Sequence, residues 1–247
     1  MASEMCAAEL SWNSGRMCVF DLETTAADPE EARIVTACVG SVGEGQDPMV
    51  REWLVDPGVD IPAEATAVHG ITTDRAREDG MSPVDAVREI AEELCRAWSA
   101  GVPVVAFNAA YDLTVLDREC RRHDVSYGFP VAGPVIDPYV IDREVDRYRR
   151  GKRTLTAMCE HYRVTLGGAH NAAADAVAAG RVAWAIAQRY PQVAGMSLTE
   201  LHEAQVGWHR GRQTDFSAYL RRTGKPDGGV CTAWPQRPVT PVAVTSD

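Results

Sequence analysis

Two acidic residues stand one position apart at the end of an apolar segment, CVFDLETT, residues 18–25. Because successive side chains of a strand alternate between its faces, Asp21 and Glu23 would point the same way and repel each other. Either a compensating charge lies beside them, or the strand ends there and lets both carboxylates reach water. The fold must therefore bring the end of an apolar strand to a polar edge.

Composition sets the size and general class of the protein. The chain has 247 residues, enough for one domain of ordinary to large size with an appendage. Acidic residues outnumber basic ones by 35 to 25, and the formal net charge is -10. This balance argues against a broadly basic nucleic-acid surface or a polybasic membrane anchor. It is compatible with a nucleic-acid enzyme, because a cation held by carboxylates can bring phosphate to an acidic site.

Cysteine usage and hydropathy predict a cytoplasmic protein without a membrane segment. The seven cysteines include no CxxC pair, so buried thiols in a reducing compartment are favoured over a zinc site or a disulfide framework. Residues 1–12, MASEMCAAELSW, contain acids and no continuous apolar stretch, unlike a signal peptide. No segment approaches the roughly 20 apolar residues that cross a bilayer.

Strand and helix signals follow each other in the order of an α/β protein. Three short strands, expected over 17–24, 32–45 and 48–58, are separated by turn-length links and predict an antiparallel meander. A loop with one helical turn is expected over 57–72. The remaining elements are expected to be helices over 82–101, 110–123, 154–164 and 171–190, and strands over 102–108 and 133–142.

The chain changes character at Pro191 and again at Thr223. An imperfect amphipathic pattern predicts a helical segment that either docks a partner such as a polymerase or folds back over an apolar patch. Five basic residues here also suit contact with phosphate: Arg210, Arg212, Arg221, Arg222 and Lys225. Frequent Pro and Gly after Thr223 predict disorder. We expect a main domain over 1–190, a helical extension over 191–222 and a disordered tail over 223–247.

Three further acids lie next to expected strand ends or helix starts: Asp112, Asp137 and Asp175. Taken singly, Asp112 is typical of a helix N-cap and Asp175 of a residue favoured by the helix dipole. His170, five residues before Asp175, is by itself an ordinary loop histidine. We interpret Asp137 as a structural or supporting residue.

Taken together, Asp21, Glu23, Asp112 and Asp175 make an oxygen-donor site. Carboxylates without thiolates or clustered imidazoles select Mg²⁺ or Mn²⁺ rather than Zn²⁺. A divalent cation would offset the repulsion between the two acids of the first strand. Two such ions, roughly 3.5–4 Å apart, can clamp the attacking and leaving oxygens of a phosphoryl displacement.

Four segments, in order, resemble motifs of the DEDD exonucleases of the histidine subclass, DEDDh. FDLETT (20–25) resembles the first motif, and VVAFNAAYDLTVL (104–116) resembles the second. HNAAADAVAAG (170–180) matches the third motif, H-x4-D. AVHGIT (67–72) matches an auxiliary segment of the proofreading epsilon-subunit branch of DNA polymerase III. The resemblance covers about residues 16–190, and several motifs in order are more specific than a lone DxE.

The resemblance implies a ribonuclease H-like α/β fold, with a mixed central sheet of about five strands and helices on both faces. It implies that Asp21, Glu23 and Asp175 hold a first Mg²⁺ or Mn²⁺ ion and that Asp21 and Asp112 reach a second. His170 would be the general base. The implied reaction is hydrolysis of the 3′-terminal phosphodiester bond of single-stranded DNA ends, which releases nucleoside monophosphates.

The resemblance also places five residues near the 3′-terminal nucleotide: Thr24, Thr25, His69, Phe107 and Asn108. Phe107 stands where the family usually has histidine, an alanine follows ETT where the family has glycine, and Tyr111 stands where phenylalanine is commoner. These departures affect the walls of the site and not its metal ligands. They bear on substrate preference more than on catalysis.

The spacing of the third motif predicts how its two residues are placed. At about 100° per residue, His170 and Asp175 would not share a helix face at a separation of five. His170 is therefore expected on the preceding loop, with Asp175 inside the helix. Gly167 and Gly168 fit either a hinge that lets the base close over substrate or a simple turn.

Two other functions compete with a DNA exonuclease. An exoribonuclease of the ribonuclease T or oligoribonuclease type uses the same acids and differs in its contacts to the 2′-OH. The HGIT segment favours DNA. An inactive partner-binding module would lack a ligand, whereas all four acids and the histidine are present. The acids do not distinguish proofreading from repair or independent action.

Overall fold

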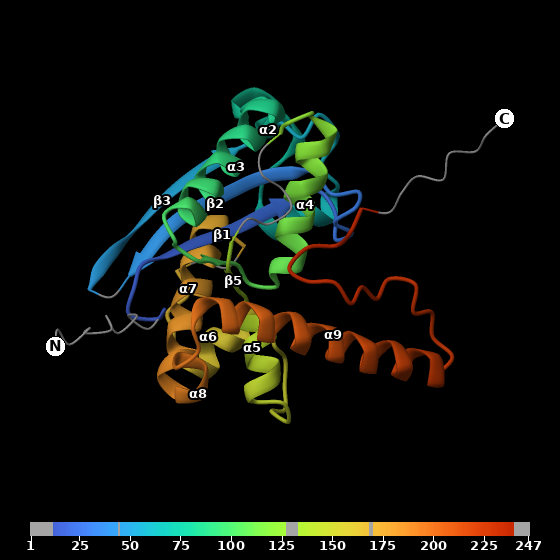
Figure 1. Ribbon diagram of the computed structural model, residues 1–247. Helices are drawn as coiled ribbons and strands as arrows, with labels where there is room; N and C mark the ends of the chain where they lie inside the picture. Colours follow the sequence, from blue (N-terminus) through green and yellow to red (C-terminus); the bar gives the residue numbers. More distant parts are fainter. Residues whose placement is uncertain (1–11, 44, 127–132, 168–169, 240–247) are drawn as a thin grey trace.

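The computed structural model describes residues 12–43, 45–126, 133–167 and 170–239, which fold around a five-stranded sheet (Figure 1). Its strands are β1 (Met17–Thr24), β2 (Ile34–Gly43), β3 (Gln46–Leu54), β4 (Val104–Val105) and β5 (Val135–Ile136). Its helices are α1 (Ala63–His69), α2 (Thr73–Asp79), α3 (Pro83–Ser99), α4 (Ala109–Arg122), α5 (Pro138–Val145), α6 (Leu155–Tyr162), α7 (Ala172–Arg189), α8 (Pro191–Ala194) and α9 (Leu198–Arg222).

The acidic segment belongs to the central strand of a mixed sheet. The strand order is β3-β2-β1-β4-β5. β1, β2 and β3 pair antiparallel, because their short links allow nothing else, whereas β4 and β5 run parallel to β1 after helical crossovers. The predicted meander and the predicted mixed sheet are confirmed.

Alternate residues of β1 enter hydrophobic clusters on opposite faces of the sheet. Phe20 packs in one cluster with Ile90 of α3 and Leu113 of α4. Val19 packs in the other cluster with Ala179 of α7. Figure 1 shows α3 and α4 in front of the sheet and α7 behind it. The predicted α/β fold with helices on both faces is therefore confirmed.

Helix α7 lies unusually close to the sheet because Gly180 faces it. A Cβ atom at Gly180 would lie 2.6 Å from Val19 Cγ1 and 2.8 Å from Val42 Cγ2, distances that real Cβ atoms do not tolerate. Asp21 and Glu23 lie on the same face of β1 as Val19. The close contact at Gly180 therefore also sets how near the start of α7 comes to these two acids.

We expect Gly180→Ala to destabilise the protein by about 1–3 kcal/mol, since an extra methyl group overpacks this contact. Alanine is the better helix former, so Gly207→Ala provides the matched control. Gly207 lies in α9, where an added Cβ would have no neighbour within 4 Å, and its substitution should add up to about 1 kcal/mol. Urea unfolding measures both. Equal stabilisation by the two substitutions would contradict close packing of α7 on β1.

The segment 57–72 is more helical than the sequence indicates. Instead of a loop with one turn, it contains α1 and leads directly into α2. Gly70 ends α1 in the left-handed conformation at φ 76, and Thr72 caps α2 by accepting a hydrogen bond from the Arg75 N–H. A helix of this length has too few turns to display a clear apolar period, which explains the difference.

The strand predicted over 133–142 is mostly a helix. Only Val135 and Ile136 pair with β4, and α5 begins at the next two residues, Asp137 and Pro138. Asp137 is the N-cap of α5. Proline suits the first helical position because its missing N–H has no partner to lose there. The sequence contains this cap signal, and the apolar residues on either side of it conceal it.

The predicted helical extension is the long helix α9, which folds back on the domain. It starts at a capping box, in which the Ser197 hydroxyl accepts from the Glu200 N–H and the Glu200 carboxylate accepts from the Ser197 N–H. Leu201 and Gln205 are buried, and Leu201 joins the cluster that contains Val19 of β1. The boundary between a main domain and an extension at residue 190 stays a prediction. No described helix is both long and apolar enough to span a membrane.

Within the tail predicted to be disordered over 223–247, the part around Trp234 packs against the domain, residues 223–226 are exposed, and 240–247 lie outside the described residues. The Trp234 side chain is 5% exposed, and its Nε1–H donates to Asp137 Oδ2 at 3.3 Å. The Arg237 N–H donates to the hydroxyl of Thr114 in α4 at 2.9 Å. One buried indole in a Pro- and Gly-rich segment produces no periodicity, so composition alone misses this anchor.

Candidate active site

Asp21 and Glu23 lie on one face of β1, the face that α7 covers. In the antiparallel ladder, Asp21 is opposite Cys38 and Glu23 is opposite Thr36 of β2. The register shifts immediately after Glu23. Both acidic side chains are half-buried. The central strand thus ends with two carboxylates held between the core and the surface.

Asp112 is fixed to the backbone between these two acids. It lies in the first turn of α4, is buried, and its Oδ1 accepts a hydrogen bond from the Leu22 N–H at 3.0 Å. Asn108 precedes α4 with a φ of 60, a left-handed conformation that asparagine adopts more readily than most residues. This sharp turn starts α4 directly after the short strand β4 and aims its first turn at β1.

The start of α7 supplies the remaining acid and the histidine. Asn171 caps the helix by accepting from the Ala174 N–H at 3.0 Å. His170 precedes the cap at a φ of 63, and its backbone N–H donates to Asp175 Oδ2 at 3.0 Å. His170 is thus on the loop and Asp175 in the helix, the arrangement that their spacing predicts. Gly168, one of the two proposed hinge glycines, lies outside the described residues.

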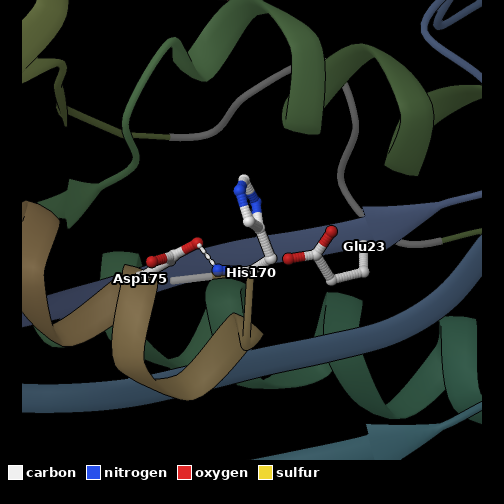
Figure 2. Close-up of side chains that lie close together, drawn as sticks. All are labelled: Glu23, His170 and Asp175. Carbon is white, nitrogen blue, oxygen red and sulfur yellow. Dashed lines mark hydrogen bonds between the residues drawn. The ribbon is translucent and has the colours of Figure 1, made fainter. Parts of the chain in front are cut away.

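Glu23, His170 and Asp175 meet at one point. One ligand atom from each residue lies within 4.8 Å of the others, and Figure 2 shows His170 between the two carboxylates. His170 is exposed, and the two acids are half-buried. Asp175 Oδ1 is itself buried and has no hydrogen-bond partner among the described residues. An unsatisfied buried carboxylate oxygen beside a second carboxylate is a suitable ligand for a cation.

The acids raise one another's pKa values because they are close and partly desolvated. Burial raises the pKa of Asp21 well above its ordinary value, and the charges of Asp112, Asp175 and Glu23 raise it further. Burial and then Asp175 raise the pKa of Glu23 to about 7. Burial also raises the pKa of Asp112, although the Leu22 N–H opposes this shift. A divalent cation would offset both the desolvation of these carboxylates and the repulsion between them, so the residues present fit such an ion.

The two threonines after Glu23 stabilise the loop that follows β1. Thr24 Oγ1 is hydrogen-bonded to the hydroxyl of Tyr111, which also donates to the Ala26 carbonyl. The buried Thr25 accepts from the Arg33 N–H at 3.0 Å. Thr25 is therefore engaged within the protein, whereas its predicted role is contact with the terminal nucleotide. That role stays a prediction for both threonines.

His69, Phe107 and Asn108 have exposed or unsatisfied groups. His69 lies beside the Thr24 backbone, and its Nδ1 accepts from the Ile71 N–H at 3.1 Å. Its Nε2 is buried without a hydrogen-bond partner among the described residues. Phe107 is half-buried, and Asn108 is exposed. The structure thus brings His69 to the end of β1, where a nucleotide contact is predicted.

Asp137 supports the site from behind. It is 1% exposed, and its carboxylate accepts from the N–H groups of Asn108, Ala109 and Tyr139, each at 2.9 Å, as well as from Trp234. Burial raises its pKa to about 6, and these donors lower it. Its N-cap position fits the interpretation of Asp137 as a structural residue.

Sequence reasoning gives no supporting role to Gln205 or Trp234, and it places Tyr111 only among the walls of the site. Gln205 Oε1 accepts from the Asp137 N–H at 2.7 Å, and its Nε2 donates to the Val135 carbonyl at 3.0 Å. A glutamine on the apolar stripe of α9 is a usable signal, since a buried amide requires partners. The position of Tyr111 beside the second-motif acid gives a weaker signal, and Trp234 gives none.

Comparison with protein families agrees with this geometry. The family model described as Exonuclease (RNase_T) matches residues 18–183, the stretch that contains every residue of the acidic site. The chain belongs to the exonuclease family. The DEDDh resemblance of its motifs is thereby confirmed at the level of the family.

Two relatives of this exonuclease-family chain carry DNA polymerase III in their names. A DNA polymerase III subunit epsilon-like protein of Rhodobacter capsulatus is 30% identical over 209 residues, which cover 81% of this chain and 28% of that protein. A PolC-type DNA polymerase III of Lacticaseibacillus paracasei is 26% identical over 194 residues, covering 78% of this chain and 13% of the polymerase. The chain therefore spans less than a third of either relative.

A solved DEDDh structure shares the fold. The nuclease domain of 3′hExo, a DEDDh family member determined with bound rAMP, superposes with a TM-score of 0.58 at 18% identity. The superposition covers 71% of this chain and 92% of that domain. The ribonuclease H-like exonuclease fold is thereby confirmed.

We expect Asp21→Asn to stabilise the metal-free protein, because it removes a desolvated charge whose repulsion by Asp112, Asp175 and Glu23 raises the pKa of Asp21. Metal-free wild type should also lose stability as the pH rises through the raised pKa of Glu23, about 7, because the folded state then gives up protons that it holds more tightly than the unfolded state. Urea unfolding in EDTA at several pH values measures both. The exposed Asp47→Asn is the control, and an equal gain there would contradict crowding at Asp21.

Asp137→Ala should cost about 3 kcal/mol or more, since several buried N–H donors lose their acceptor together. Asp137→Asn keeps part of the acceptor capacity and should cost less. Urea midpoints combined with turnover on a nuclease substrate distinguish a structural role from a catalytic one. Wild-type stability with lost activity would move Asp137 into the reacting centre.

Proposed function

We propose that this protein is a metal-dependent 3′→5′ exonuclease that hydrolyses the 3′-terminal phosphodiester bonds of DNA. The convergence of Glu23, His170 and Asp175 at the end of the central strand carries the proposal. Asp21 and Asp112 complete the acidic site, and all five residues lie inside the segment that matches the exonuclease family. An inactive protein of this fold is expected to lack one of these residues, and the sequence contains all five.

The proposed cofactors are two Mg²⁺ or Mn²⁺ ions, supported by a donor set of carboxylate oxygens. Asp21, Glu23 and Asp175 would hold one ion, and Asp21 and Asp112 would hold the other. When bound, the ions would neutralise the acids and supply charge stabilisation to the transferring phosphoryl group. The buried Asp175 Oδ1 lacks a hydrogen-bond partner among the described residues, so coordination to an ion would satisfy an oxygen that is otherwise unpaired there.

His170 is the proposed general base. Its exposed position at the mouth of the acidic site suits a group that must reach both a water molecule and the end of a strand. It would take a proton from the attacking water while the water oxygen bonds to the terminal phosphorus and the bond to the 3′-oxygen breaks. That oxygen takes a proton from solvent. The products are a nucleoside 5′-monophosphate and a strand shortened by one nucleotide with a free 3′-OH.

DNA is proposed over RNA on the names of the relatives, which are DNA polymerase III proteins. An exoribonuclease is the second candidate, because the DEDDh neighbour was determined with rAMP bound. Discrimination between them depends on whether a 2′-OH is contacted or excluded. A proofreading role, and attachment to a polymerase through 198–222, are proposed on the same names.

The deciding experiment is digestion of 5′-labelled and 3′-labelled single strands of DNA and RNA with Mg²⁺, Mn²⁺ or EDTA. We expect metal-dependent release of labelled mononucleotide from the 3′-labelled DNA and a ladder of shortened products from the 5′-labelled DNA. Faster digestion of RNA would replace the proposed substrate with the second candidate. No cleavage of either polymer by folded protein would overturn the proposal.

Two substitutions separate the roles within the site. His170→Ala should lower turnover by about 10²–10⁴, the usual contribution of a general base, and leave metal binding intact. Asp175→Ala should lower turnover further and weaken Mn²⁺ binding measured by calorimetry, since a ligand is lost. The exposed Asp47→Ala serves as the control. Near wild-type turnover in Asp175→Ala would show that the site is assigned wrongly.

A further inference from the structure

A groove outside the acidic site lies between α5 and α9, which Figure 1 shows side by side below the sheet. It encloses about 310 Å³, near the lower end of the range for ligand sites. Its walls are mainly aromatic and basic: Tyr139, Arg143, Trp208, Arg212 and Phe216 contribute to them, and Glu144 is the single acid among the lining residues. None of these residues has a role in the proposed chemistry.

The wall formed by α9 continues the stripe that attaches this helix to the domain. Leu201 and Gln205 are buried against the domain, and Trp208, Arg212 and Phe216 follow at helical spacing. Trp208 is half-buried, whereas Arg212 and the 47%-exposed Phe216 are open to solvent. The stripe therefore leaves the core and changes from the uncharged, buried Leu201 and Gln205 to alternating aromatic and cationic residues. Covering the domain does not require such a change.

The groove gathers positive charge in a protein whose net charge is -10. Partial desolvation of the Arg212 guanidinium lowers its pKa, and the neighbouring guanidinium groups of Arg143, Arg153 and Arg147 lower it further. Arg147 and Arg153 form ion pairs with Asp215 and Asp142. The Arg143 guanidinium donates to the Tyr139 hydroxyl, and its buried Nε has no hydrogen-bond partner among the described residues. Cations held close together against their own repulsion suit an anionic ligand.

Aromatic contacts run from the groove to Phe107, next to the turn that starts α4. Tyr139 holds the Arg143 guanidinium 5.0 Å from its ring centre and meets the Phe107 ring edge-on at 5.6 Å. Phe107 precedes Asn108, at the turn that starts α4 and positions Asp112. A strand with its 3′ end at the acids could thus pass Phe107 and Tyr139 on its way to α9.

We infer that this groove binds the single-stranded nucleic acid upstream of the 3′ end, with bases stacking on Phe216 and Trp208 and phosphates contacting Arg143 and Arg212. Basic grooves with interleaved aromatic rings are the general means of holding single strands without sequence preference. The inference rests on the proposed exonuclease function for the direction of the strand. It assigns α9 a substrate-holding role in place of, or in addition to, attachment to a polymerase.

The test is fluorescence anisotropy of a 5′-labelled oligothymidylate with the full chain in EDTA, which prevents cleavage. Arg212→Ala should weaken binding about fivefold or more at low salt and reduce the salt slope by about 0.7, the share of one phosphate on a single strand. Phe216→Ala should weaken it about fivefold without changing the slope, and Phe216→Tyr should restore it. Glu144→Gln should tighten binding. An oligouridylate arm shows whether the groove prefers DNA.

Arg88→Ala, on the exposed part of α3, is the charge-matched control and should leave binding unchanged. Equal binding by wild type, Arg212→Ala and Phe216→Ala would overturn the inference and leave this face of α9 to a protein partner. Equal weakening by Arg212→Ala and Arg88→Ala would also overturn it, because a bulk charge effect would then explain the loss.

A mononucleotide substrate separates this inference from the proposed function. The p-nitrophenyl ester of thymidine 5′-monophosphate is too short to reach α9, so the ratio of kcat/KM for the oligonucleotide to kcat/KM for the ester should fall in the groove variants. If wild type hydrolyses neither substrate, the proposed function fails while the anisotropy measurement still decides the groove. If the ester is hydrolysed and the ratio does not change, the groove inference alone fails.

Discussion

The carboxylate of Asp137 is the interaction on which the rest of the structure depends. The carboxylate accepts hydrogen bonds from the first N–H group of α4, from the first turn of α5 and from the indole of Trp234. The backbone N–H of Asp137 donates to Gln205 of α9. Four segments that are far apart in sequence thus converge on one buried acid. The burial of an ionisable group is tolerated here because these donors satisfy it. Removing the carboxylate would leave several buried donors unsatisfied together.

A second constraint is electrostatic, because gathering several acids in one place costs free energy. The acids of β1, α4 and α7 are brought together although burial raises their pKa values, and the charges of neighbouring acids raise those of Asp21 and Asp112 further. The scaffold overcomes this cost with neutral contacts: the Leu22 N–H bonded to Asp112, the His170 N–H bonded to Asp175, and the close fit of Gly180 against Val19. These contacts hold the acids together, although the repulsion among them leaves the folded state less stable than the scaffold alone would make it.

Sequence reasoning recovers the parts of this architecture that have local signals. The alternation in CVFDLETT, the turn-length links after it and the H-x4-D spacing are local patterns, and the meander and the positions of His170 and Asp175 follow from them. The helix α5 is concealed because Asp137-Pro138 interrupts an apolar run that fits a strand equally well. Trp234 cannot be predicted from pattern, because its burial depends on contacts about a hundred residues away in sequence, such as the one to Asp137.

Helix α9 links the buried Asp137 to the groove. Gln205 holds the Asp137 backbone from α9, and the next turns of the same helix carry Trp208, Arg212 and Phe216 into the groove. Helix α9, which supports Asp137, therefore also fixes the distance between that groove and Asp112 of α4. A strand held on α9 would be presented to the acids at a set length, because α9 bonds the Asp137 N–H and the start of α4 bonds the Asp137 carboxylate. Coupling of this kind requires a rigid helix, and the capping box at Ser197 together with the burial of Leu201 provides one.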